Sequence, residues 1–185
     1  GSWFDAATAD AVIRRFANSP RPQRAVIGPW NHGAAQQVGA KENSFSRLAQ
    51  MKEALRLFDT PPTTRELHYF TLFENQWKSV SEWPPEGFSA SRFYFQPQGV
   101  LAGDASAPQT ADGFEVDFAT STGSNNRWQT ELDQRPIRYA PIQAPLSYTS
   151  APLTADTEIT GYPIVTIWAT STHDDGAFFV YLEAL

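Results

Sequence analysis

The chain has 185 residues, of which 41% are hydrophobic, and its net charge at neutral pH is -6. These values predict a globular protein with a sizeable core and exclude global disorder. The acidic balance, with no basic block, argues against a nucleic-acid partner, and no apolar run approaches membrane-spanning length. The chain has no cysteine, which excludes disulfides and thiolate metal sites, and its first residues show no signal-peptide pattern.

Residues 1–62 combine helix and strand patterns in alternation. We expect a helix over residues 5–18, a short buried strand over 24–27 and a second helix over 46–58. Each helix has one apolar face of the kind that covers a core. The face of the first helix comprises Ala9, Val12, Ile13 and Phe16. The face of the second comprises Leu48, Met51, Leu55 and Phe58.

From about residue 65 the period of the apolar pattern changes from 3.6 to two, which is typical of strands. Turn-rich segments separate several short runs, and this predicts a β-sandwich or jelly roll. The expected strands are residues 66–73, 92–96, 114–119, 145–149, 164–170 and 177–182. Because the chain stops inside its last apolar run, at Leu185, we expect an incomplete sandwich. The predicted fold class is an α/β piece over 1–62 followed by an all-β domain over 63–185.

A histidine follows the first expected strand directly. The strand ends at Gly28-Pro29, and His32 stands in a loop between Asn31 and Gly33. A loop histidine beside a strand end is a candidate general base, because its pKa lies near working pH. The alternative is a structural turn histidine whose ring packs on a neighbouring tryptophan.

An acidic residue stands at the other end of the same unit. Asp5 precedes the first expected helix, and its separation of 27 positions from His32 accommodates one helix and one strand. In this position Asp5 can accept a hydrogen bond from the Nδ1–H of His32 and stabilise the imidazolium. The alternative is a residue that only complements the helix dipole.

A catalytic nucleophile is not found in the sequence. The nearest approach to a nucleophile elbow is residues 87–91, which lacks the final glycine, precedes a strand and follows the acid and the histidine. We interpret His68 as a sheet-surface or satisfied core histidine. The cluster His173-Asp174-Asp175 is rejected as a metal site, because successive side chains diverge, and no metal or cofactor is predicted.

Several segments together resemble the CocE/NonD family of cocaine esterase and X-prolyl dipeptidyl peptidase-like serine hydrolases. Residues 2–5 (SWFD) resemble the family segment that carries the triad acid, and residues 28–33 (GPWNHG) resemble the segment that carries the triad histidine. Further similar segments follow in the family's order, at residues 69–78, 82–85, 146–153, 157–161 and 175–183. The resemblance therefore extends over essentially the whole chain.

This resemblance implies an α/β-hydrolase domain followed by a jelly-roll-like β domain, and a parent enzyme that cleaves esters or amides through an acyl-enzyme. It implies that Asp5 is the triad acid and His32 the triad base. The serine and the oxyanion hole would lie upstream of residue 1, so the chain would be truncated at both ends and inactive alone. The expected partner is a small-molecule ester or a peptide substrate, with no membrane or nucleic acid, and a homo-oligomer is compatible with the sequence.

Two other functions remain open. The tryptophan-rich β domain could be a carbohydrate-binding or protein-interaction module. Alternatively, the chain could be a subunit whose His32 completes a site with a serine from another chain. A binding module would need neither the acid nor the histidine found in residues 1–33, and this favours the hydrolase hypothesis.

Overall fold

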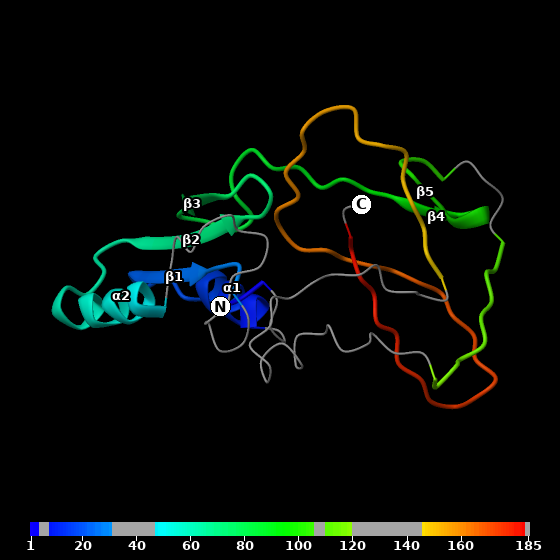
Figure 1. Ribbon diagram of the computed structural model, residues 1–185, viewed down its shortest axis with the longest axis horizontal. Coiled ribbons are helices and arrows are strands. Elements are labelled where there is room, and N and C mark those ends of the chain that lie inside the picture. The colour runs from blue at the N-terminus through cyan, green and yellow to red at the C-terminus, as the bar shows by residue number, and fades with distance from the viewer. Residues whose placement is uncertain (4–7, 31–46, 106–109, 120–145, 184–185) are drawn as a thin grey trace.

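The computed structural model describes residues 1–3, 8–30, 47–105, 110–119 and 146–183 (Figure 1). Helices and strands are concentrated in the first half of the chain. Within the described residues the elements are α1 (Thr8–Asn18), β1 (Gln23–Ile27), α2 (Arg47–Asp59), β2 (Arg65–Thr71), β3 (Gln76–Val80), β4 (Tyr94–Gln96), the 3-10 turn η1 (Pro97–Gly99) and β5 (Val100–Ala102). Among these residues, no helix is long and apolar enough to cross a membrane.

The larger sheet has three strands in the order β1-β2-β3. Strands β1 and β2 are parallel, with Ala25 opposite Leu67, and α2 lies in the connection between them. Parallel neighbours need such a crossover, because the chain must return to the starting edge of the sheet. Strand β3 pairs with β2 in the antiparallel direction, with Phe70 opposite Trp77. The larger sheet therefore combines β1, from the expected domain over residues 1–62, with β2 and β3, from the expected domain over residues 63–185.

The core lies between α1 and the two parallel strands β1 and β2. Its buried side chains are Ile13, Phe16, Ile27, Leu67, Tyr69 and Trp83. The predicted apolar face of α1 is confirmed, since Ile13 and Phe16 are buried and Ala9 and Val12 pack against the cluster. Arg65 also fastens α1 to β2, because its guanidinium lies over the Phe16 ring at 4.4 Å and donates to the Phe16 carbonyl at 2.6 Å.

Helix α2 forms as predicted, but the expectation that its apolar face would cover a core is wrong. Leu48, Met51, Leu55 and Phe58 are all more than half exposed. On another face of α2, Glu53 pairs with Arg24 of β1 at 2.5 Å and with Arg56 at 2.8 Å. The ion pair between Glu53 and Arg24 therefore connects α2 with β1.

A small second sheet consists of β4 and β5, at the end of the molecule opposite α2 (Figure 1). A tight turn joins the two strands, with Gln98 and Gly99 both at positive φ (66° and 73°). Residue Thr149 bonds to this hairpin, because Leu101 N donates to its carbonyl and Thr149 N donates to the Gly99 carbonyl. The strand expected over residues 92–96 is thus confirmed in part, and that over 145–149 is reduced to one bridge at Thr149.

The strands expected over residues 114–119, 164–170 and 177–182 are wrong, because these described residues form no strand. Figure 1 shows the last two as long connecting segments. Their apolar side chains, such as Ile164, Trp168 and Phe179, are largely exposed. Alternation specifies one apolar face, but a strand also needs a neighbouring chain to complete its hydrogen-bond ladder. The described fold is one of mixed sheets with few helices, consistent with a C-terminal β domain.

Candidate functional site

Asp5 and His32, the two predicted catalytic residues, lie outside the described residues. The structure does describe the segment that leads to each of them, residues 1–3 and residues 28–30.

These two segments run side by side in parallel. Ser2 forms a parallel bridge with Gly28, where Trp3 N donates to the Gly28 carbonyl at 3.1 Å and Gly28 N donates to the Gly1 carbonyl at 3.2 Å. Gly1 N donates to the Val26 carbonyl at 2.7 Å. The N-terminal segment thus extends the sheet beside β1, at the carboxyl end of that strand.

A side-chain hydrogen bond adds to this pairing. The Ser2 hydroxyl donates to the carbonyl of Trp30, and Ser2 is only 3% exposed. Ser2 also bonds to the first residue of α1, because its backbone N–H donates to Thr8 Oγ1 at 3.1 Å and its carbonyl accepts from the same hydroxyl at 3.3 Å. Ser2 therefore connects the start of α1 with the segment that leads to residue 32.

Trp30 folds back over the chain that precedes it. A Cβ placed on Gly28 would lie 2.0 Å from the nearest atom of the Trp30 ring, so only glycine allows this approach. The ring is 6% exposed and contacts Trp77 of β3, with ring centroids 5.9 Å apart. Trp77 in turn contacts Phe70 of β2 in an edge-on arrangement at 5.3 Å.

The acid-bearing segment is held by a second group of aromatic residues. Trp3 Nε1 donates to the Phe70 carbonyl at 2.8 Å. The Trp3 ring lies 6.4 Å from Trp83, and Trp83 contacts Tyr69 edge-on at 5.3 Å. Strands β2 and β3 and the segment after them therefore support both predicted site segments. The sequence does not predict this role of Trp77 and Trp83, because an aromatic residue does not by itself indicate which residue it contacts.

His68 has a structural environment, as predicted. Its Nε2 lies 3.1 Å from Glu66 Oε2, and Arg24 lies 3.4 Å from the same carboxylate oxygen. The hydrogen bond to His68 is the main cause that lowers the pKa of Glu66 below its usual value. In this cluster on β1 and β2, Arg24 and His68 both contact the carboxylate of Glu66.

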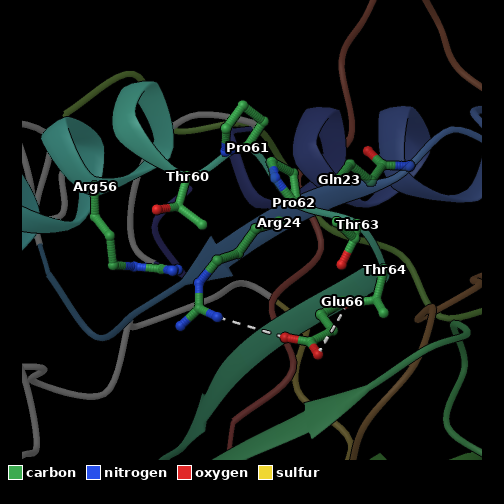
Figure 2. Close-up of a pocket in the computed structure, with 9 residues that line it drawn as sticks. All are labelled: Gln23, Arg24, Arg56, Thr60, Pro61, Pro62, Thr63, Thr64 and Glu66. Atoms are coloured by element: carbon green, nitrogen blue, oxygen red, sulfur yellow. Dashed lines mark hydrogen bonds and ion pairs between the residues drawn. The ribbon is translucent and has the colours of Figure 1, made fainter.

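A hollow of about 220 Å³ lies beside this cluster, between the end of α2 and the starts of β1 and β2 (Figure 2). Arg24 reaches into it and pairs with Glu66, as the dashed line in Figure 2 shows. Arg56 is paired with Glu53, whose pKa is lowered chiefly by that hydrogen bond. The charges at this hollow balance one another, so its lining does not indicate an ionic ligand.

A distant segment is attached to the sheet through Glu158. Its carboxylate accepts from Lys78 of β3, from Thr160 at 2.7 Å and from the Tyr69 hydroxyl at 3.3 Å. Burial raises the pKa of Glu158, but the hydrogen bonds from Lys78 and Thr160 outweigh it, and the pKa lies below the usual value. Lys78 also pairs with Glu74 at 2.6 Å. Tyr69 and Lys78 belong to β2 and β3, the two strands that also contact Trp3 and Trp30. We therefore assign these contacts a structural role.

A family model described as the X-Pro dipeptidyl-peptidase C-terminal non-catalytic domain matches residues 53–185. Over 98% of its length the chain is 36% identical to two proteins named as candidate serine esterases, from Mycobacterium bovis and Mycobacterium tuberculosis. The match covers 31% of each of them, so the chain spans about a third of the length of these curated relatives. No solved structure gives a significant match. The chain belongs to the X-Pro dipeptidyl-peptidase C-terminal domain family, which confirms its resemblance to the CocE/NonD-like serine hydrolases.

Proposed function

We propose that the chain is part of a serine hydrolase that cleaves esters or amides by a Ser-His-Asp triad. Residues 1–62 are the last part of its α/β-hydrolase domain, and residues 63–185 belong to its jelly-roll-like β domain. Support comes from the family match over residues 53–185 and from relatives named as serine esterases. Those relatives are about three times as long as the matched region, which leaves room for the remaining part of a hydrolase domain.

In this proposal His32 is the general base and Asp5 orients it. His32 Nε2 takes the proton of the serine hydroxyl as the serine oxygen attacks the substrate carbonyl, and it returns that proton to the leaving alcohol or amine. Water then attacks the acyl-enzyme carbonyl while His32 takes a proton from the water, and His32 gives that proton to the serine oxygen as the acid is released. Asp5 accepts the Nδ1–H bond and stabilises the imidazolium formed in both steps. The serine belongs to a part of the longer protein outside these 185 residues.

The observation that carries the proposal is the parallel pairing of Ser2 with Gly28. It brings the chain that leads to Asp5 beside the chain that leads to His32, at the carboxyl end of β1. In open α/β sheets, functional groups gather at the carboxyl ends of parallel strands. In the sequence, Asp5 follows Ser2 by three residues and His32 follows Gly28 by four.

The substrate class is a small acyl ester, an α-amino acid ester or an Xaa-Pro peptide, and no metal is required. The test is hydrolysis of a p-nitrophenyl ester and of an Ala-Pro p-nitroanilide by the longer protein, with His32→Ala and Asp5→Asn variants. We expect His32→Ala to reduce kcat by about 10³-fold or more, and Asp5→Asn by up to about 10⁴-fold. Wild-type activity that survives in His32→Ala would overturn the proposal.

A further inference from the structure

The edge of β1 that faces away from β2 is occupied only at its carboxyl end in the part of the chain that the structure describes. In a parallel ladder, both backbone groups of a residue point to the same neighbouring strand, and successive residues alternate. Gln23 N donates to the Thr64 carbonyl, so Gln23 and every second residue after it face β2. The Val26 carbonyl and the Gly28 N–H face the opposite side, where both bond to Gly1.

The same alternation leaves the N–H of Val26 and the N–H and C=O of Arg24 on this outer edge of β1. No described segment pairs with these groups, since β1 is the last strand of the sheet on this side and Gly1 reaches only as far as the Val26 carbonyl. A row of unpaired backbone groups is a ready template for a further strand. The outer edge of β1, defined by Arg24 and Val26, therefore has the hydrogen-bonding groups of an interaction surface.

We propose that this outer edge binds the residues that directly precede Gly1 in the longer protein, as an extended strand parallel to β1. The inference rests on the proposed function only in that the 185 residues belong to a longer chain. Gly1 and Trp3 already pair with the β1 segment in parallel register, so the residues before Gly1 continue that ladder toward Arg24. The curated relatives are about three times as long as the matched region, which provides such a segment.

The bonds of Gly1 set the register of the added strand. Gly1 N donates to the Val26 carbonyl at 2.7 Å, and the Gly1 carbonyl accepts from Gly28 N at 3.2 Å. This pattern repeats every two residues, because alternate residues of a strand face the same neighbour. The residue two positions before Gly1 therefore donates to the Arg24 carbonyl and accepts from the Val26 N–H, so the added strand satisfies the outer edge.

Helix α1 sets the chemistry of the added strand. A Cβ on Gly1 would lie 3.1 Å from Val12 Cγ2 and 3.3 Å from Ala9 Cα, so this position faces α1. Because side chains alternate along a strand, the residue two positions earlier faces α1 as well. Ala9 and Val12 are apolar and only partly buried. Parallel strands that helices cover are rich in apolar side chains, and we expect the same of the added strand.

Amide hydrogen exchange in the longer protein tests this pairing residue by residue. We expect the Val26 and Arg24 amides to be as protected as the Ala25 amide, which points toward β2 and is the internal control. Alternate amides directly before Gly1 should be protected in step with them. Val26 and Arg24 amides that exchange about 100-fold or more faster than Ala25 would overturn the inference. A wholly unprotected segment before Gly1 would overturn it as well, because another segment would then cover the edge.

Proline variants of the longer protein give a second readout. A strand tolerates proline where the missing N–H faces solvent, and not where that N–H is bonded. We expect Val26→Pro to lower the unfolding midpoint about as much as Ala25→Pro, and by at least about 5 °C more than Val26→Ala. A Val26→Pro protein as stable as Val26→Ala would contradict the added strand. Neither measurement uses activity, so the kinetics of His32→Ala test the proposed function separately.

Discussion

The hydroxyl of Ser2 donates a hydrogen bond to the backbone carbonyl of Trp30, which lies 28 residues further along the chain. Both residues are buried. This bond connects the segment before α1 with the segment after β1, and these are the segments that carry the predicted acid and histidine. It therefore fixes the relative position of the two segments that lead, in the sequence, to Asp5 and His32.

Replacement of Ser2 by alanine should destabilise this pairing. The Trp30 carbonyl would lose its side-chain donor in a buried position, which costs about 1–3 kcal/mol of unfolding free energy. Urea unfolding followed by tryptophan fluorescence measures the loss. Ser89→Ala, at an exposed position, is the matched control and should stay within about 0.5 kcal/mol of wild type. Equal stabilities for the two variants would contradict the assigned role of Ser2.

Gly28→Ala should be poorly tolerated. The added methyl group would lie 2.0 to 2.3 Å from three atoms of the buried Trp30 ring, so the ring must leave its place against Trp77. Overpacking of this kind costs about 1–3 kcal/mol. In Gly113→Ala the new methyl group meets nothing within 4 Å, and we expect little change. A Gly28→Ala protein with wild-type stability and fluorescence would show that the ring does not fold over Gly28.

On α2, replacement of a charged residue should lower the stability of the fold more than replacement of an apolar one. Glu53→Gln would remove the carboxylate that pairs with Arg24 and Arg56, and we expect a loss of about 1 kcal/mol. Leu55→Gln should stay within about 0.5 kcal/mol, because Leu55 is 64% exposed. Denaturant unfolding of both variants at low salt is the measurement. The opposite order of stabilities would mean that the apolar face of α2 is buried in solution.

The Glu158 contacts predict a dependence of stability on acid pH. The folded-state pKa of Glu158 lies below the usual value of 4.5, so the ionised carboxylate stabilises the fold above that pH. This contribution is lost as the pH falls through the folded-state pKa. Glu158→Gln should therefore be less stable than wild type at pH 7, and the difference should shrink below about pH 4.5. A difference that stays constant from pH 7 to pH 3 would contradict this account, and exposed Glu82→Gln serves as the control.

The sequence correctly predicts those elements that a pattern of neighbouring residues identifies. The face of α1 with Ile13 and Phe16, and the apolar run that forms β1, are correct because a period of 3.6 or a short buried run identifies them. Strand β2 is correct as well, and its buried residues are the apolar or aromatic Leu67, Tyr69 and Phe70. Residues 76–80 were not predicted as strand β3, since their mixed polarity shows no alternation.

The remaining differences come from tertiary contacts that no local pattern contains. The period of α2 identifies an apolar face but does not show that Glu53 meets Arg24 instead. The alternation over residues 164–170 predicts a strand but supplies no neighbouring strand. At the candidate site, the order of acid and histidine could be read from the sequence, whereas the Trp30–Trp77 contact joins residues 47 positions apart and required the structure.

The central claim is that His32 serves a serine nucleophile located outside these 185 residues. The most direct measurement is the intact mass of the protein after treatment with a fluorophosphonate, for the longer protein, its His32→Ala variant and the 185-residue chain. The account predicts one covalent adduct on the longer protein, strongly slowed labelling in His32→Ala, and no adduct on the chain alone. An adduct on the 185-residue chain that depends on His32, or equal labelling of the longer protein and its His32→Ala variant, would contradict it.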